Sequence, residues 1–319
     1  MKQPAISVLM TAYNTEAYIT ESIQSILNQS LMCFELIILD DGSTDSTFDI
    51  IEEFSDPRIK LFQNEKNCGL TYSRNKCLEL AQGTYIAWLD ADDLATPDRL
   101  EKQFNFMEAN PEFAMIGGWV QPIDKSGNAK GKVWKYYAKP EEIPAELFFH
   151  NYFAQSAVMI RKSMLPEIRY LPDYPPVEDY ELWIRIAENG KCWNLQEVVL
   201  KYRVYDQSIT FRESDKHLAA KNLITKNQLS KLCSDPNKAD TYQEFITNKI
   251  SDFTTLKKHA SELKELNIEK KLYRQKIFNA KLVDLLIKKA PVKTLLYYIN
   301  IKQLPDLFYW FIIQLRKIG

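Results

Sequence analysis

The sequence predicts an α/β protein with a mostly parallel sheet flanked by helices, followed by a helical C-terminal region. In the first 120 residues, apolar runs of strand length alternate with amphipathic segments of helical period, as expected for successive strand and helix units. Polar residues follow each apolar run. After about residue 213 the composition shifts to helix formers, and no further strand-like run occurs.

Composition narrows the class of protein. The chain has 319 residues, 45% of them hydrophobic, which is ample for a large core. Its five cysteines include no Cys-x-x-Cys pair and it has three histidines, so neither a disulfide framework nor a zinc cluster is indicated and a reducing cytosol fits best. The N-terminal apolar run breaks at Thr11, too early for a secretion signal or a membrane span, so we expect no export.

Four strands and three helices are expected in the first ninety residues. The strands are Ile6–Met10, Phe34–Leu39, Arg58–Phe62 and Tyr85–Leu89. Apolar residues at helical spacing place the helices near Ile19–Leu27, Phe48–Phe54 and Leu70–Leu80. Polar clusters follow the strands at Thr11–Asn14, Asp40–Asp45, Asn67–Asn75 and Asp90–Asp93. Since the carboxyl ends of parallel strands share one edge of a sheet, the four clusters should converge on one site.

The last cluster holds three carboxylates within four residues: Asp90, Asp92 and Asp93. Such groups repel one another unless a divalent cation or ample water neutralises them. A simpler alternative is that Asp92 or Asp93 caps a helix starting near Thr96. On this stretch alone both interpretations stay open.

The middle of the chain holds a further apolar run and an acidic helix start. Phe153–Lys162 is expected to form another core strand, ending at a short helix that Pro166 interrupts. Further on, Pro175 and Pro176 set a turn, and the acidic pair Glu178–Asp179 opens an apolar helix. Acidic residues in a first turn also favour the helix dipole, so a capping role and a functional role can coexist there.

The order of motifs TAYN, DDGSTD, NxGLxxSRN and LDADD resembles glycosyltransferase family 2, inverting enzymes of GT-A fold that use nucleotide sugars. The resemblance covers about the first two thirds of the chain. One motif alone is weak evidence, since DDGSTD could be an Asx-turn with a helix cap. Four motifs in the right order and spacing are strong evidence.

The resemblance implies a UDP-sugar donor and places residues around it. Those nucleotide-sugar-binding residues are Thr11, Tyr13, Asp40, Asp41, Asn67, Gly69, Arg74 and Asp90. Asp40 is the less certain partner of the uridine, because the last residue of a strand can point to either side of the pleat. Without the resemblance, Tyr13 could be a half-buried aromatic at a strand end and Arg74 a solvated helix residue.

The resemblance also implies a metal and a base. Asp92 would bind Mg²⁺ or Mn²⁺, with Asp93 as a supporting residue, and the metal would stabilise charge on the departing diphosphate. Asp179 would be the catalytic base, supported by Glu178 and Trp183. A single carboxylate near the acceptor implies inversion, because a retaining double displacement would need a second carboxylate as nucleophile.

Two departures from the family's patterns limit what carries over. Many relatives have a YRxH segment, whereas this chain has Tyr205 in the position of the histidine, which puts a third metal ligand in doubt. The QxxRW signature of processive relatives is also missing. We therefore expect one sugar to be added per encounter.

The expected domains are a catalytic domain at 1–212, divided into a nucleotide-sugar half (1–120) and an acceptor half (121–212), and a helical region at 213–319. Helices are expected over Asp215–Leu232, Ala239–Leu266 and Glu269–Lys289. From Lys257 onward 14 Lys and Arg face 5 Asp and Glu, and the last thirty residues are rich in aromatics. The apolar runs of these C-terminal helices are too short to span a bilayer, but the helices could bind to an anionic membrane surface. The alternative is that they pack on the catalytic domain or on a partner chain.

The sequence thus predicts a metal-dependent inverting glycosyltransferase that acts on a glycan or lipid-linked acceptor, in surface polysaccharide biosynthesis, at the inner face of the plasma membrane. A nucleotidyltransferase would share the sheet and the metal carboxylates, but no Gly-rich loop follows the first strand. A non-catalytic nucleotide-binding scaffold is the third possibility. Retention of every acidic motif argues against it.

Overall fold

A computed structural model describes residues 4–164, 169–205, 214–233, 242, 258–259 and 261–263. The chain divides into two compact units. The first comprises Met1–Ile143 with Asn151–Ala220, and the second comprises Pro144–His150 with Lys221–Gly319. The sheet and the candidate site belong to the first unit.

The first half of the sheet is parallel, as predicted. It contains β1 (Ile6–Ala12), β2 (Phe34–Asp40), β3 (Ile59–Gln63) and β4 (Tyr85–Trp88). β1 lies between β2 and β4, and β3 pairs with the outer side of β2. Every residue of β2 is buried, and so is all of β1 except Thr11. Because successive side chains of a strand point to opposite faces, both faces of this part of the sheet are covered.

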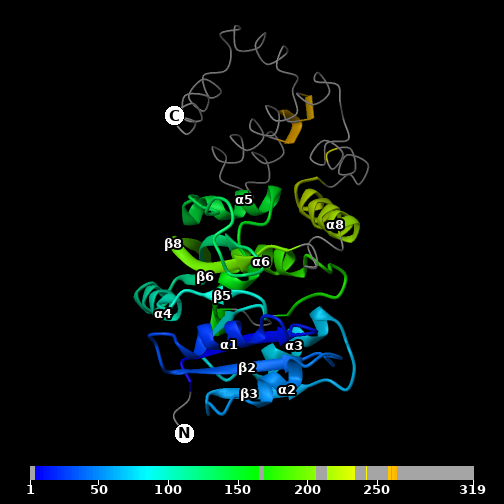
Figure 1. Ribbon diagram of the computed structural model, residues 1–319. Coiled ribbons are helices and arrows are strands. Elements are labelled where there is room, and N and C mark those ends of the chain that lie inside the picture. The colour runs from blue at the N-terminus through cyan, green and yellow to red at the C-terminus, as the bar shows by residue number, and fades with distance from the viewer. Residues whose placement is uncertain are drawn as a thin grey trace. The chain divides into compact units, whose positions relative to one another are not determined.

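The second half of the sheet is mixed, and three of its strands, β5, β6 and β8, are labelled in Figure 1. It contains β5 (Leu94–Ala95), β6 (Phe113–Ile123), β7 (Met159–Arg161) and β8 (Lys191–Arg203). β7 is antiparallel to both β4 and β6, β6 is parallel to β8, and β5 is antiparallel to β8. The complete order is β3-β2-β1-β4-β7-β6-β8-β5. The fold is therefore a mixed α/β sheet flanked by helices.

The predicted helices form close to their expected bounds. They are α1 (Ile19–Leu27), α2 (Thr47–Glu52), α3 (Leu70–Leu80), α6 (Glu178–Asn189) and α8 (Ser214–Leu232). Two more α-helices are α4 (Arg99–Ala109) and α5 (Ile143–Phe149). Ile19, Ile23 and Ile26 of α1 bury their side chains in the core cluster that also holds alternate residues of β1. This packing fixes the loop that joins β1 to α1.

The local structure differs from the sequence analysis at three places. The predicted strand Phe153–Lys162 is reduced to β7, because Gln155–Ala157 forms a 3-10 turn (η2). The polar side chain of Ser156 in that turn accepts a hydrogen bond from the backbone N–H of Asp90. β6 and β8 were not predicted as strands. Finally, α4 begins at Arg99 after Asp98, so neither Asp92 nor Asp93 caps it.

The remaining expectations concern parts of the chain that are not described. Outside the described residues lie Pro166, most of the helix expected over Ala239–Leu266, all of the helix expected over Glu269–Lys289, and the aromatic C-terminal segment. Among the helices that are described, none combines the length and the apolar character needed to cross a membrane.

Candidate active site

The candidate site lies at the carboxyl edge of the parallel strands, where the sequence places it. The register pairs Ala12 at the end of β1 with Asp40 at the end of β2. Asp90 follows β4, the other neighbour of β1. The first, second and fourth polar clusters therefore start from adjacent strands. The third cluster joins them through hydrogen bonds to Asp41.

Asp41 organises the loop that precedes α3. Its buried carboxylate accepts hydrogen bonds from the backbone N–H groups of Cys68 and Gly69, both at 2.9 Å, and from Asn64 Nδ2 at 2.7 Å. Gly69 has a φ of 92°, a conformation that side chains with a Cβ rarely adopt. Asn67 is exposed, and its Oδ1 accepts a second bond from Gly69 N–H at 3.0 Å. Asp41 thus shapes the loop predicted to hold the nucleotide.

Asp40 is fully buried and stabilises the loop that follows β2. Its carboxylate accepts hydrogen bonds from the backbone N–H and the hydroxyl of Ser43, and from Gln63 Nε2 at 3.1 Å. Gly42 has a φ of 70°, and a Cβ at that position would lie 2.5 Å from the backbone carbonyl carbon of Lys66. The loop after β2 is therefore tightly packed. The side-chain oxygens of Asp40 are engaged within it.

The loop after β1 exposes the ring of Tyr13, and its backbone is held by hydrogen bonds to the loop after β2. Thr11 is half-buried at the end of β1, and Tyr13 is 44% exposed. Asn14 has a φ of 53° and joins the neighbouring loop: its Oδ1 accepts a bond from Thr44 N–H at 2.8 Å, and its N–H donates to Ser43 Oγ at 2.9 Å. The sequence analysis gave Asn14 no role of its own. The sequence feature that could have indicated a role is an asparagine inside a polar loop, because asparagine tolerates a positive φ.

The three carboxylates after β4 lie in different environments. The backbone N–H of Asp93 donates to the carbonyl of Asp90 at 3.1 Å, which closes a turn. The Asp93 side chain is fully buried and accepts a bond from the backbone N–H of Arg203 at 2.8 Å. Asp90 and Asp92 are half-buried. Asp93 therefore attaches the turn to β8, and Asp90 and Asp92 remain as candidates for ligand contact.

Asp92 interacts with Tyr205, the residue that stands in the histidine position of the YRxH segment. Tyr205 donates a hydrogen bond of 2.8 Å from its hydroxyl to Asp92 Oδ2, and its ring lies 5.3 Å from the ring of Tyr18. Burial, and then the neighbouring Asp90 carboxylate, raise the pKa of Asp92 to about 6. The ionised form of Asp92 is thus costly in the folded protein without a cation.

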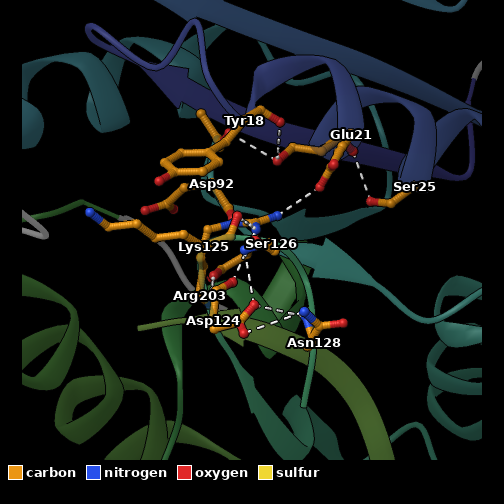
Figure 2. A network of polar contacts seen from close by, with 12 residues as sticks. Tyr18, Glu21, Ser25, Asp92, Asp124, Lys125, Ser126, Asn128 and Arg203 are labelled. Atoms are coloured by element: carbon orange, nitrogen blue, oxygen red, sulfur yellow. Dashed lines mark hydrogen bonds and ion pairs between the residues drawn. The ribbon is translucent and has the colours of Figure 1, made fainter. Parts of the chain in front are cut away.

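Arg203 fixes the backbone beneath Asp92 (Figure 2). Its buried guanidinium donates from Nε to the carbonyl of Asp92 at 2.8 Å and from Nη2 to Glu21 Oε2 at 2.8 Å, and lies 4.6 Å from the centre of the Tyr18 ring. The sequence analysis gave no role to Arg203 or Glu21. The two residues lie 182 positions apart, so only the folded chain shows that they meet.

Arg74 is buried between two carboxylates. Its Nη1 donates to Glu178 Oε1 at 2.6 Å and its Nη2 to Asp90 Oδ1 at 3.3 Å. The guanidinium also lies over the rings of Trp88 and Tyr170, at 5.9 and 5.6 Å from their centres. The solvated alternative for Arg74 is therefore wrong. Arg74 links the turn after β4 to the first turn of α6.

Asp179 occupies that first turn beside Glu178. Asn151 Nδ2 donates to its Oδ2 at 3.1 Å, and the backbone N–H of Tyr180 donates to its Oδ1 at 2.7 Å. Burial, followed by the charge of Glu178, raises the pKa of Asp179 to about 6. Trp183 is fully buried in the same helix. A carboxylate poised near neutral pH has the character of a general base.

The residues present suit a divalent cation that draws most of its ligands from a substrate. No group of three or more His, Cys, Asp or Glu side chains in the described part of the chain could hold a metal by itself. Within those same residues, Tyr205 is the side chain that donates to the Asp92 carboxylate, through Oδ2. One carboxylate, with phosphate and water oxygens, is how Mg²⁺ is commonly held beside nucleotides.

Comparison with known proteins bears on the family of the chain. A model of the family described as "Glycosyl transferase family 2" matches residues 7–169. An uncharacterised glycosyltransferase of Methanocaldococcus jannaschii is 39% identical over 209 residues, which are 64% of this chain and 72% of that protein. The Escherichia coli UDP-Glc:alpha-D-GlcNAc-diphosphoundecaprenol beta-1,3-glucosyltransferase WfaP is 32% identical over 222 residues, 69% of this chain and 85% of that protein.

Solved structures share the fold at lower identity. The structure of S. aureus TarS in complex with UDP-GlcNAc matches with a TM-score of 0.59 and 19% identity, over 90% of this chain and 81% of that one. The mannosyltransferase PcManGT from Pyrobaculum calidifontis, in complex with GDP-Man and Mn²⁺, matches with a TM-score of 0.55 and 15% identity, over 91% and 88% of the two chains. At these identities the likeness concerns the fold alone.

Proposed function

The chain belongs to glycosyltransferase family 2, and from this premise we propose that it transfers one sugar from a UDP-sugar to a glycan or lipid-linked acceptor, with inversion and with the help of a divalent cation. The observation that carries the proposal is that Arg74 joins Asp90, two residues before Asp92, to Glu178, which directly precedes Asp179. It joins the residues expected at the donor to the residue expected to act as base.

The donor and acceptor classes are supported by the relatives. The name of the E. coli enzyme specifies UDP-Glc as donor and a diphosphoundecaprenol-linked sugar as acceptor, and the S. aureus structure holds UDP-GlcNAc. A hexosyl or N-acetylhexosaminyl donor on UDP, and a lipid-linked acceptor in surface polysaccharide biosynthesis, are therefore the classes that we propose. Tyr13 offers an exposed ring face to the uracil.

Asp92 would hold the cation through its carboxylate, with Asp90 beside it. Bound Mg²⁺ or Mn²⁺ supplies Lewis-acid stabilisation of charge on the departing diphosphate. The protein's own contribution is to fix Asp92: Arg203 holds its carbonyl and Tyr205 holds its second carboxylate oxygen. Such support orients a metal-binding carboxylate before the substrate arrives.

Asp179 would accept the proton of the attacking acceptor hydroxyl. Asn151 and the backbone of Tyr180 orient its carboxylate, and its pKa of about 6 leaves it ionised at neutral pH and more basic than an ordinary aspartate. The proposed reaction is a single displacement, since one carboxylate serves as base. The anomeric carbon therefore inverts.

Action on a lipid-linked acceptor places the enzyme at the inner face of the plasma membrane as a peripheral protein. The basic, aromatic-rich C-terminal segment is one proposed contact with anionic lipid.

A panel of nucleotide sugars tests the proposal. The purified full chain is incubated with UDP-, GDP- and dTDP-linked sugars in Mg²⁺, in Mn²⁺ and in excess EDTA, and release of the nucleoside diphosphate is measured with and without a diphosphoprenol-linked sugar. We expect metal-dependent release from one or a few UDP-sugars, accelerated by the acceptor. Full activity in EDTA, or release from no UDP-sugar, would overturn the assignment.

A further inference from the structure

Residues 125–139, which we call the basic hairpin, contain no side chain to which the proposed reaction gives a role. The segment contains five lysines and no acidic residue, whereas the whole chain has a formal net charge of −1. These five side chains are exposed: Lys125, Lys130, Lys132, Lys135 and Lys139. None of the ion pairs within the described residues involves them. Positive charge concentrated in this way, on a nearly neutral chain, indicates an anionic partner.

The basic hairpin is ordered by its own backbone. It folds back antiparallel to the end of β6: Trp134 N–H donates to the carbonyl of Val120 at 2.8 Å, and Lys130 N–H donates to the carbonyl of Pro122 at 2.8 Å. The turn between them is closed by Asp124, whose Oδ1 accepts bonds from the N–H groups of Ser126 and Asn128 at 2.9 Å. The lysines are therefore presented by a fixed scaffold.

Two large aromatic side chains stand among these lysines. Trp134 is 40% exposed with its ring 5.4 Å from that of Tyr202, and Tyr137 is 59% exposed with its ring 5.5 Å from that of Trp119. The ammonium of Lys135 lies 4.8 Å from the centre of the Trp119 ring. Amphipathic rings beside lysines are the combination that occupies the lipid headgroup region of membrane-bound proteins.

We propose that the basic hairpin docks this protein on an anionic phospholipid surface, with Trp134 and Tyr137 entering the headgroup region and the lysines facing the lipid phosphates. A single bound phosphate fits less well, because the five ammonium groups are all exposed and distributed over fifteen residues. A planar array of anionic headgroups matches that distribution by charge.

The docking surface is joined to the donor site by one side chain. Arg203, which holds the carbonyl of Asp92, also donates from Nη1 to the carbonyls of Lys125 and Asp124, at 2.7 and 3.2 Å. Figure 2 shows Arg203 between the turn of the hairpin and Asp92. Docking would hold the metal-binding turn close to the lipid surface. The use of this arrangement for a lipid-linked acceptor rests on the proposed function.

The test uses the full chain and two kinds of substitution. Trp134→Phe keeps an aromatic ring but removes the indole, and Lys130→Gln with Lys132→Gln removes two charges. Lys66→Gln with Lys191→Gln removes the same charge from exposed positions outside the hairpin. Each protein is mixed with vesicles of phosphatidylglycerol and phosphatidylcholine, or of phosphatidylcholine alone, and co-sedimentation is measured at low and high salt. Vesicles with brominated acyl chains then report quenching of tryptophan fluorescence. The C-terminal segment is present throughout, so differences between variants arise in the hairpin.

We expect binding to phosphatidylglycerol vesicles that falls by about fivefold for each hairpin lysine removed, so by more than tenfold in the Lys130/Lys132 variant, with little change in the Lys66/Lys191 control. Brominated lipid should quench the wild type more than the Trp134→Phe variant. Equal binding of hairpin and control variants, or equal quenching with and without Trp134, would refute the proposal. Loss of vesicle binding on adding inorganic pyrophosphate at constant ionic strength would also refute it, by showing a phosphate pocket instead. UDP binding in solution, measured on the same proteins, reports on the proposed function separately.

Discussion

Arg74 on α3 donates a hydrogen bond of 2.6 Å to Glu178 on α6, although the two residues are 104 positions apart in the chain. The same guanidinium contacts Asp90. Glu178 is fully buried, and its charge is the second cause, after burial, of the raised pKa of Asp179. Arg74 acts in the opposite direction and lowers that pKa. The pair therefore sets the basicity of Asp179 while it joins the donor and acceptor sides of the site.

The first prediction is that Glu178→Gln makes Asp179 a weaker base. Removing the neighbouring negative charge leaves the lowering effect of Arg74, so the pKa of Asp179 should fall from about 6. Because the base must be ionised, the acidic limb of the kcat/KM profile should move to lower pH, by about one unit. Glu181→Gln is the matched control, since Glu181 pairs with Arg185 on the same helix. An unshifted limb in the Glu178 variant would mean that another group titrates.

The second prediction is that Asp92→Asn stabilises the metal-free protein at pH 8 while abolishing transfer. The folded-state pKa of Asp92 is raised to about 6, so the folded state binds a proton more tightly than the unfolded state does. The stability from this group is thus present below pH about 4 and is lost as the pH rises through about 6. Asparagine removes that loss.

We expect the Tm of the metal-free variant to exceed that of the wild type by a few degrees at pH 8, since 1 kcal/mol corresponds to about 2–4 °C in a domain of this size. The difference should shrink at pH 4–5. Mg²⁺ with UDP should raise the Tm of the wild type only. Asp173→Asn, at an exposed position, is the control. A variant that still gains stability from Mg²⁺ and UDP would place the metal elsewhere.

The third prediction concerns Tyr205, the residue in the family's histidine position. Tyr205→Phe keeps the ring against Tyr18 but removes the 2.8 Å hydrogen bond to Asp92. Loss of a partner that orients a metal-binding carboxylate commonly weakens metal affinity by about 10–100-fold. The Mn²⁺ concentration for half-maximal activity should rise accordingly.

Tyr18→Phe serves as the control, because it preserves the ring contacts of Tyr18 with Tyr205 and Arg203. If both phenylalanine variants need the same metal concentration as the wild type, Tyr205 does not orient Asp92 through its hydroxyl.

The parallel half of the fold could be predicted from sequence because its strands are apolar runs of the right length with helices between them. β6 could not, because Gly117 and Gly118 interrupt it and glycine weakens a strand that is judged by itself. In the structure these glycines allow β6 to approach β8. A Cβ on Gly117 would lie 2.2 Å from Asn194 Oδ1, and one on Gly118 would lie 2.5 Å from Val199.

The candidate site, like the fold, has a part that could be predicted from the sequence and a part that could not. The convergence of four polar loops follows from strand order, and the sequence analysis placed it. Which carboxylate pairs with which cation does not follow from strand order. Arg74 was expected at the nucleotide, and strand order did not indicate that it is also buried between Asp90 and Glu178. Arg203 reaches Asp92 across 111 positions, and no local pattern encodes such a pairing.

The last prediction separates the base from the rest of the site. Asp179→Asn keeps the shape of the side chain, and its oxygen can still accept a bond from Asn151 or Tyr180. UDP-sugar affinity, measured by calorimetry in Mg²⁺, should stay near the wild-type value, because Asp92, Asp90 and Arg74 are unchanged. Transfer should slow by about 10² to 10⁴, the usual effect of losing a general base.

The same base assignment fixes the stereochemistry of the product. With one carboxylate on the acceptor side, the hydroxyl attacks the anomeric carbon from the face opposite the diphosphate, so an α-linked donor should give a β-linked product. NMR of the product's anomeric proton distinguishes the two linkages. An α-linked product would require a nucleophile that forms a covalent intermediate, and normal turnover by the Asp179→Asn variant would require another base. Either result would remove Asp179 from its proposed role while leaving the donor site of Asp92, Asp90 and Arg74 in place.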